Sequence, residues 1–272
     1  MLGAVSGDVI GSIYELKNIK SKDFPLFSQY DRYTDDTVMT CAIAEASMIY
    51  ALDKDKKNFR NNCIKYMKEY GLKYIDAGYG GMFIRWLITD GKTPYYSYGN
   101  GSAMRVSSVA YAADSLEEAE SLAEISAAVT HNHPEGIKGA KAVASAIWLL
   151  KNGASKEDVK KYIEDNYYKL NFKIDDIRKD YRFDVSCQGS VPQAIEAFLE
   201  SSSFEDSIRT AISIGGDSDT IGAITGSLSE AYYGIPMEIQ DKVVFYLDDG
   251  LKKVVDGFYS NKAIFDSRTK NM

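Results

Sequence analysis

The sequence has little cysteine and histidine. Three cysteines (Cys41, Cys63 and Cys187) and two histidines (His131 and His133) occur among 272 residues, and the cysteines are far apart and lack a CxxC pair. This pattern argues against a disulfide framework and against a thiolate zinc site. It predicts a protein of a reducing compartment, the cytoplasm.

Long apolar runs and an N-terminal targeting signal are missing as well. No run approaches the roughly 18 consecutive apolar residues of a membrane-spanning helix. The first residues of the chain contain no basic region, and Asp8 interrupts the apolar stretch early. We therefore expect neither a membrane span nor a signal peptide.

Concentrated positive charge is also absent. The chain has 32 Lys+Arg against 39 Asp+Glu, a formal net charge of −7. Without a block of basic residues, binding to duplex nucleic acid is disfavoured. A chain of this length can bury roughly 75% of the surface that its unfolded form exposes, so it needs no disulfide or structural metal to fold. We expect a monomer or a weak oligomer.

Apolar residues at helical spacing are what the sequence has in abundance. Hairpin signals, βαβ alternation, linkers and low-complexity segments are not found, so the chain is predicted to be all-α, one domain over residues 1–272. Leu16–Arg32 and Gly91–Gly99 are predicted loops, and Leu170–Gln188 is predicted to be irregular with brief extended segments. The predicted helices are Leu2–Tyr14, Asp35–Tyr50, Lys57–Tyr70, Met82–Ile88, Ala103–Ala113, one capped by Ser115 and ending at Thr130, Pro134–Leu150, one capped by Ser155 and ending near Asn166, Pro192–Glu200, Phe204–Ser213, Thr220–Tyr232 and a short one opened by Pro236.

The first predicted helix has glycine on one face. Gly3, Gly7 and Gly11 recur every four residues, a spacing that places them together on a helix. Because glycine weakens a helix, this pattern predicts a crowded, central helix that another backbone approaches closely. A dinucleotide-binding phosphate loop is disfavoured, since the spacing is not GxGxxG and no strand precedes it.

Two short acidic stretches open small-residue-rich helices about 180 residues apart. They are Tyr33–Thr37 and Gly215–Thr220, and each has two carboxylates and a flanking threonine hydroxyl. Asp35 and Asp36 are adjacent, so on a helix their side chains diverge by about 100° and suit two neighbouring ions better than one.

Simple helix capping would explain either acidic stretch alone, because helix N-termini favour negative charge. The small residues, however, mark both helices as buried, and Arg32 is the only basic residue adjoining either stretch. Buried carboxylates without basic partners need cations, and oxygen ligands without His or Cys favour Mg²⁺, Mn²⁺ or Ca²⁺ over zinc. We therefore predict that the two stretches meet as a two-metal site. Glu15 is either a further ligand or an ordinary solvated glutamate at a helix end.

A glycine-rich loop, Ser97–Ser102, precedes another predicted helix. With Gly99 and Gly101 in it, the loop can offer backbone N–H groups to an anion, although an ordinary glycine turn is the alternative. His131 is predicted to be a hydrogen-bonding group and His133 a structural residue, rather than a His-x-His metal pair. Cys187 has no activating neighbour in the sequence, so we predict a buried thiol and not a nucleophile.

The combination of motifs resembles one known family. Gly7-Asp8-Val9-Ile10-Gly11 through Glu15, Thr34-Asp35-Asp36-Thr37, Gly99-Asn100-Gly101-Ser102-Ala103-Met104-Arg105, Thr130-His131 and Gly215-Gly216-Asp217-Ser218-Asp219-Thr220 occur in this order. From Leu2 to about Pro236, the chain looks like an ADP-ribosylglycohydrolase. The resemblance implies a compact orthogonal multi-helix domain with a binuclear Mg²⁺ or Mn²⁺ site in a central cleft. It also implies hydrolysis of the N- or O-glycosidic bond at C1″ of ADP-ribose.

The resemblance also assigns roles to residues. Ser218 is a mild departure from the family pattern, because many members have threonine at this position. Tyr98, in the glycine-rich loop, is a candidate to stack on adenine. The implied metal ligands are Thr34, Asp35, Asp36, Asp217, Asp219 and Thr220. The implied substrate-binding residues are Ser97, Tyr98, Gly99, Asn100, Gly101, Ser102, Met104 and His131. The catalytic candidates are Glu15, Asp35, Asp36 and Asp219, among which the sequence does not choose.

With the acidic stretches, the resemblance implies a metal-dependent hydrolase that releases ADP-ribose from an acceptor, and ADP-ribosyl-arginine on protein is the leading expected substrate. Serine-linked adducts, O-acetyl-ADP-ribose and adducts on nucleic-acid bases are alternative substrates. Two other classes stay open: a non-catalytic ADP-ribose-binding protein, and a metal-dependent phosphodiester or pyrophosphate hydrolase.

Overall fold

The structure is a computed structural model that describes residues 1–89 and 93–265, and these residues are mainly helical, with no sheet. The predicted all-α class is therefore confirmed. The loop predicted over Gly91–Gly99 can be followed only from Thr93, because residues 90–92 lie outside the described part. The helices of the described residues are α1 (Leu2–Gly11), α2 (Asp35–Asp53), α3 (Lys56–Lys73), α4 (Gly81–Ile88), α5 (Gly101–Met104), α6 (Ser107–Ala112), α7 (Leu116–Ala128), α8 (Pro134–Lys151), α9 (Lys156–Asn166), α10 (Ile174–Arg178), α11 (Cys187–Glu200), α12 (Phe204–Ile212), α13 (Ser218–Tyr233), α14 (Met237–Tyr246), α15 (Asp249–Tyr259) and α16 (Lys262–Phe265).

The predicted helix Ala103–Ala113 is wrong as a single element. The chain forms α5 and α6 with a break at Arg105 and Val106, whose ψ angles are −4° and −9°. Those angles lie outside the helical range, so the helix stops there. The break lets the Arg105 side chain turn inward, where it is 1% exposed.

The segment Leu170–Gln188 also differs from its prediction. It holds helix α10 and the first residues of α11, and its extended character is reduced to one isolated bridge between Gly99 and Ser186. Helix α11 begins at Cys187 and not at Pro192, because the Ser186 hydroxyl accepts the Gly189 N–H at 3.1 Å and caps an earlier start.

Helix α15 was not predicted, although the sequence contains its signals. The Asp248 carboxylate accepts the Leu251 N–H at 2.9 Å as an N-cap. Leu251, Val254 and Phe258 follow at helical spacing and are buried. An N-cap residue followed by apolar residues at helical spacing is a pattern that predicts a helix from sequence.

Helices α1 and α13 pack together through glycine on both sides. A Cβ on Gly7 would lie 1.9 Å from the carbonyl oxygen of Gly222, and a Cβ on Gly3 would lie 2.2 Å from that of Gly226. Only glycine permits so close an approach of two backbones. The pairing order is antiparallel, so the end of α1 lies beside the start of α13. The predicted close-packed first helix is confirmed.

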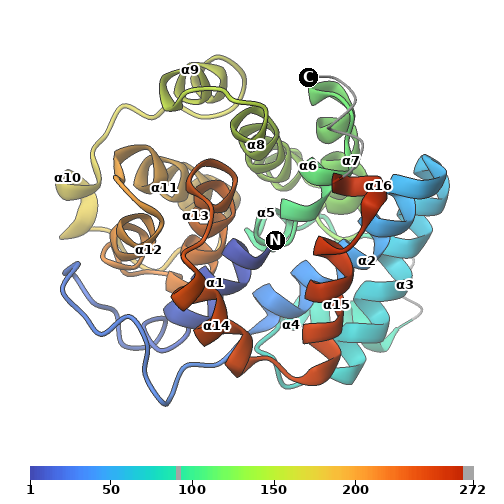
Figure 1. Cartoon of the computed structure of the whole chain (residues 1–272), viewed down its shortest axis with the longest axis horizontal. Coiled ribbons are helices and arrows are strands. Elements are labelled where there is room, and N and C mark those ends of the chain that lie inside the picture. The colour runs from blue at the N-terminus through green and yellow to red at the C-terminus, as the bar shows by residue number, and fades with distance from the viewer. Residues whose placement is uncertain (90–92, 266–272) are drawn as a thin grey trace.

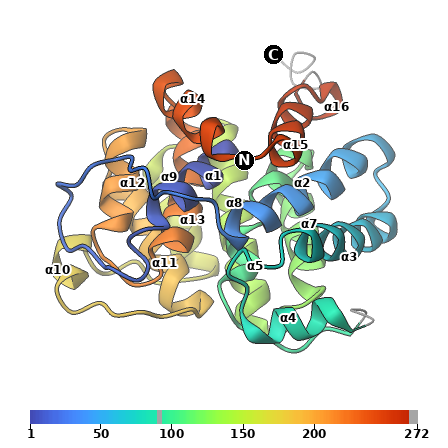
Figure 2. The same ribbon diagram turned by 90° about the horizontal axis from the view of Figure 1, so that it is seen from below.

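Figure 1 shows this helix pair beside α11 and α12, with α2 and α3 on the other side of the molecule. In Figure 2, α4 and α5 lie below α2 and α13. Because α1 also contacts α2, the starts of α2 and α13 meet near the end of α1. This arrangement brings the two acidic stretches together.

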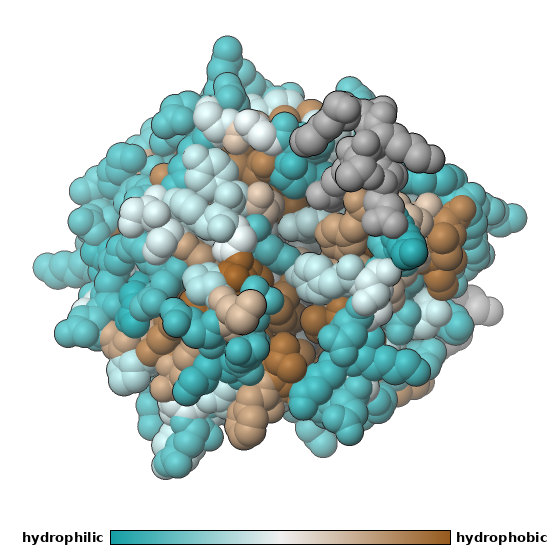
Figure 3. Space-filling model, viewed as in Figure 1, coloured by the Kyte–Doolittle hydropathy of each residue, from teal (hydrophilic) through white to brown (hydrophobic). Residues whose placement is uncertain are grey.

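The face seen in Figure 3 is mainly hydrophilic, with hydrophobic side chains gathered near its centre, where α1, α14 and α15 lie. Among residues 1–89 and 93–265, no helix combines the length and the apolar character needed to span a membrane.

Candidate metal and ligand site

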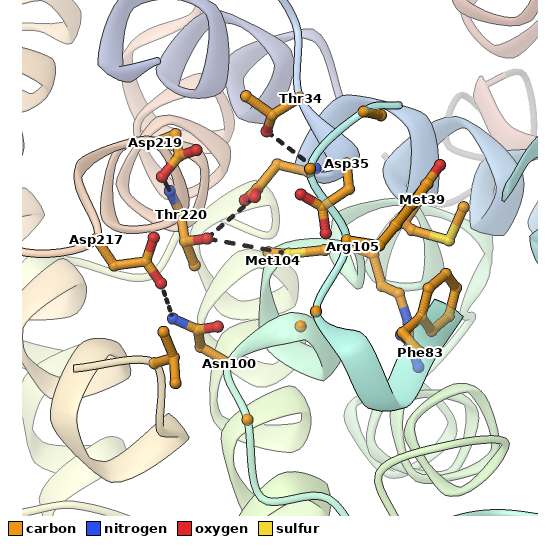
Figure 4. Close-up of a pocket in the computed structure, with 18 of the residues that line it drawn as sticks. Thr34, Asp35, Met39, Phe83, Asn100, Met104, Arg105, Asp217, Asp219 and Thr220 are labelled. Carbon is orange, nitrogen blue, oxygen red and sulfur yellow. Dashed lines mark hydrogen bonds between the residues drawn. The ribbon is translucent and has the colours of Figure 1, made fainter. Parts of the chain in front are cut away.

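A cavity of about 440 Å³ lies where the starts of α2, α4, α5 and α13 meet the segment after α1 (Figure 4). The predicted site residues Tyr98 and Ser102 do not line it. Tyr98 is 52% exposed and packs its ring on His133, while the Ser102 hydroxyl donates to the Gly136 carbonyl at 2.7 Å. The predicted residues that do line it are Glu15, Thr34, Asp35, Asp36, Ser97, Gly99, Asn100, Gly101, Met104, His131, Asp217, Asp219 and Thr220.

The start of α2 is fixed by Asp8, a residue to which the sequence reasoning gave no role. Its carboxylate is fully buried and accepts the Thr34 N–H at 2.9 Å, the Thr34 hydroxyl at 2.7 Å and the Thr37 N–H at 3.0 Å. The Thr37 hydroxyl donates to it as well. Asp8 thereby holds the first turn of α2, and with it Asp35 and Asp36, in place. An aspartate between the small residues of an otherwise apolar helix was the available signal.

Asp36 and Thr220 join the two acidic stretches directly. The Thr220 hydroxyl donates to Asp36 Oδ2 at 3.0 Å across 184 residues of sequence. The other oxygen of this carboxylate, Oδ1, is buried and has no hydrogen-bond partner among the described residues. A buried carboxylate oxygen normally has a partner, so this one is available to a cation.

Three further carboxylates lie together on the α13 side of the cavity. Ligand oxygens of Glu15, Asp217 and Asp219 all lie within 4.8 Å of one another. Asp217 accepts a hydrogen bond of 2.7 Å from the Asn100 side-chain amide (Figure 4). This bond ties the glycine-rich loop to the acidic turn.

The turn before α13 is held from outside the cavity by Asn18. Gly215 and Gly216 have φ angles of +68° and +76°, a backbone that glycine adopts without strain. The Asn18 side chain accepts the Gly216 N–H at 2.8 Å and donates to the Gly216 carbonyl at 3.0 Å. It also donates to the Glu15 carbonyl at 2.9 Å. Asn18 thus fixes Glu15 against the acidic turn, a role that nothing in the sequence indicated.

Burial and mutual repulsion make the carboxylates hard to ionise in the absence of cations. Burial, followed by the charges of neighbouring aspartates, raises the pKa values of Asp36 and Asp219 well above the ordinary value. The same causes raise the pKa of Asp35 to about 7. The pKa of Glu15 is raised by burial and Asp217, against a lowering by Arg32. Such a cluster gains stability when positive charge enters it.

The donor set fits divalent cations. It consists of carboxylate and hydroxyl oxygens, which hard ions such as Mg²⁺, Mn²⁺ and Ca²⁺ prefer, and it leaves Asp36 Oδ1 free for coordination. Asp35 and Asp36 on one side and Asp217 and Asp219 on the other face the same cavity. The two acidic stretches therefore meet at one cavity, and their oxygen donors suit divalent cations.

The glycine-rich loop forms the wall next to α11. Asn100 N–H donates to the Val185 carbonyl at 2.8 Å, and Cys187 N–H donates to the Tyr98 carbonyl at 2.9 Å. His131 lies under the loop, since a Cβ on Gly101 would be 3.2 Å from its Nε2. The Cys187 thiol is buried and donates to the Gly99 carbonyl at 3.1 Å, so it has a structural position, away from the carboxylates.

Apolar side chains complete the cavity, and the sequence reasoning did not place them. Phe183 and Val185, which line the cavity, are 54% and 52% exposed. Tyr79, in the loop before α4, and Phe83, in α4 itself, also line it. Exposed aromatic and aliphatic groups beside a polar centre suit a ligand with a flat ring. Side chains from irregular segments could be assigned to this edge only once the fold was known.

A family model described as ADP-ribosylglycohydrolase matches residues 1–264. ADP-ribosylhydrolase ARH3 of Mus musculus is 27% identical to the chain over 311 residues, which cover 86% of the chain and 83% of that relative. ADP-ribosylarginine hydrolase Tri1 of Pseudomonas putida is 28% identical over 157 residues, or 54% of the chain and 42% of that relative. A solved structure titled ADP-ribosylglycohydrolase-related protein complex has the same fold, with a TM-score of 0.65, 22% identity and coverage of 95% of this chain and 94% of that one.

Proposed function

The chain belongs to the ADP-ribosylglycohydrolase family and is a glycosidase, and we propose that it hydrolyses the bond between ADP-ribose and an acceptor, with arginine on protein as the first acceptor to test. The observation that supports this function best is the cavity in which two distant acidic stretches meet, joined by the Thr220–Asp36 hydrogen bond and edged by a glycine-rich loop. The Tri1 relative is named as an ADP-ribosylarginine hydrolase, which supports arginine as the acceptor to test first. We further propose that the chain is a single domain.

We propose that two Mg²⁺ or Mn²⁺ ions are held between the acidic stretches. Their ligands would be Thr34, Asp35, Asp36, Asp217, Asp219 and Thr220. When bound, such ions supply Lewis-acid polarisation of ribose oxygens and of water. The Thr34 hydroxyl donates to Asp8 and its oxygen accepts the Asp36 N–H at 3.3 Å, so one lone pair of that oxygen remains to face a cation.

The proton at the glycosidic bond would be moved by a carboxylate that substrate can reach. Asp36 and Asp219 are buried, at 2% and 5% exposure, whereas Glu15 and Asp35 are only partly buried. This difference favours Glu15 or Asp35 for proton transfer, with Asp36 and Asp219 as ligands. Carboxylates around the ribose would also stabilise positive charge that develops at C1″ as the bond breaks.

The remainder of the substrate would lie along the glycine-rich loop. Ser97, Gly99, Asn100 and Gly101 line the cavity there, and backbone N–H groups at a helix start attract a diphosphate. Phe183 and Val185 at the edge would pack against the adenine. A cytoplasmic location is also proposed, since the three cysteines are free and buried.

A panel of defined arginine-, serine- and base-linked ADP-ribosyl substrates, with O-acetyl-ADP-ribose, tests the function in Mg²⁺ or Mn²⁺. Release of intact ADP-ribose supports it, and the substrate turned over fastest identifies the acceptor. Formation of AMP and ribose 5-phosphate would instead indicate a pyrophosphate hydrolase. The variants D35N and D219N should lose turnover by at least about 100-fold, whereas D256N, at an exposed position of α15, should not. Binding of ADP-ribose without any turnover would indicate a non-catalytic protein.

A further inference from the structure

One of the residues that line the cavity is a buried arginine, Arg105. Arg105 is 1% exposed, and its Nη2 donates to the Ser126 carbonyl at 3.1 Å and to the Thr130 hydroxyl oxygen at 2.9 Å. Its Nε has no hydrogen-bond partner among the described residues. Burying a guanidinium costs solvation free energy, so we expect the charge of Arg105 to have a function.

Thr130 connects this charge to His131. The Thr130 Oγ1 lies 2.7 Å from His131 Nδ1, a hydrogen bond whose direction depends on the imidazole tautomer. Arg105 already donates to that same oxygen. The Tyr95 hydroxyl also hydrogen-bonds Thr130. When Arg105 and Tyr95 both donate to the Thr130 oxygen, the hydroxyl hydrogen of Thr130 points to Nδ1, and the nearby positive charge favours a lone pair on that side of the ring.

The opposite nitrogen of the ring faces the glycine-rich loop. A Cβ on Gly101 would lie 3.2 Å from His131 Nε2, and a Cβ on Gly99 would lie 3.4 Å from it. The ring is 6% exposed, and its backbone N–H donates to the Ala127 carbonyl at 2.7 Å, so its position is fixed. Burial and the charge of Arg105 lower the pKa of His131 well below its usual range, which keeps the ring neutral.

We propose that Arg105 and Thr130 are positioning residues that hold His131 as the neutral Nε2–H tautomer. The imidazole then presents a permanent hydrogen-bond donor to the glycine-rich loop and to an anionic oxygen bound there. The opposite tautomer would turn a lone pair toward that oxygen and repel it. The identity of the anion rests on the proposed function, but the tautomer is a property of the ligand-free protein.

The chain is well suited to a direct measurement, because His131 and His133 are its only histidines. Protein labelled with ¹⁵N-histidine gives long-range ¹H–¹⁵N correlations for two rings, which H133Q assigns. His133 is an internal reference, since its Nδ1 accepts the Glu135 N–H at 3.1 Å. Between about pH 6 and about pH 8, we expect His131 to have a protonated Nε2 and an unprotonated Nδ1. A protonated Nδ1 in that range would overturn the proposal.

Variants test the two positioning residues. T130V removes the hydroxyl and should give mixed His131 tautomers and about tenfold weaker binding of ADP-ribose in Mg²⁺, the effect of one lost hydrogen bond. T130S keeps the hydroxyl and R105K keeps the charge, so both should retain the wild-type tautomer. A wild-type spectrum in T130V would contradict the inference. Failure of the wild-type protein to bind ADP-ribose would contradict the proposed function alone, because the spectra are recorded without ligand.

Discussion

The Asn100 side chain donates a hydrogen bond of 2.7 Å to Asp217, and so connects the glycine-rich loop with the acidic turn 117 residues later. The same amide donates to the Ser190 hydroxyl at 3.0 Å, which anchors both segments to α11. The two halves of the cavity, one suited to an anion and the other to cations, are therefore mechanically joined through one side chain.

Replacing Asn100 should weaken metal binding although its side-chain amide is not a proposed ligand. N100A removes the 2.7 Å hydrogen bond from Asn100 to Asp217 and so holds this carboxylate less firmly, and loss of such a supporting bond lowers metal affinity by roughly 10- to 100-fold. Titration of the apoprotein with Mn²⁺ by calorimetry measures this. N61A, on the exposed side of α3, is the matched control and should bind as the wild type does. Equal affinities for N100A and N61A would show that the link has no effect on the ions.

Asp36 should determine how strongly divalent ions stabilise the fold. Ions that bind only the native state raise the free energy of unfolding by about 2.7 kcal/mol at 100 times the dissociation constant. In chelator, D36N should be at least as stable as the wild type, because it keeps the Thr220 hydrogen bond and removes one repelling charge. In Mg²⁺ the order should reverse. Denaturant unfolding of both proteins in both buffers measures this reversal in the order of stability. An equal increase in unfolding free energy on adding Mg²⁺ to D36N and to the wild type would remove Asp36 from the ligand set.

Substitution in the α1–α13 glycine contact should destabilise the whole molecule. Alanine would gain about 1 kcal/mol of helix propensity at Gly7, but its Cβ would lie 1.9 Å from the Gly222 carbonyl, so the helices must separate. We expect G7A to lower the free energy of unfolding by roughly 2 kcal/mol or more. G81A is the control: the added Cβ would meet no atom within 4 Å and its φ angle is ordinary, so its stability should change little.

The sequence predicted these helix contacts and the acidic pairs because each is a local pattern. The spacing of Gly3, Gly7 and Gly11 requires a close neighbour, and the Thr34–Thr37 stretch has its carboxylates and its cap within four residues. What could not be predicted depends on partners distant in sequence. Asp8 stands out as an aspartate in an apolar helix, but its role follows only once Thr34 and Thr37 are placed on its carboxylate, and Asn18 gains its role only from the Gly216 backbone. The break at Arg105 likewise follows from acceptors on α7 and just after it, which no local propensity could reveal.

Asp31 should give the protein a pH-dependent stability that is separable from the metal site. Burial raises the pKa of this carboxyl to about 6, against a lowering by the Ser28 N–H that it accepts at 2.7 Å. Because the native state then binds more protons than the unfolded chain between about pH 4 and about pH 6, the contribution of Asp31 to the free energy of unfolding falls as pH rises through that window.

D31N removes the titration and keeps an acceptor for Ser28. The difference in unfolding free energy, D31N minus wild type, should therefore increase by roughly 2 kcal/mol from pH 4 to pH 7, most of the free-energy equivalent of a pKa raised from 3.8 to about 6. Urea unfolding of both proteins across that range measures it, and the other acids cancel in the difference. A difference that stays constant with pH, or that falls, would mean that Asp31 ionises as easily in the folded protein as in the unfolded chain.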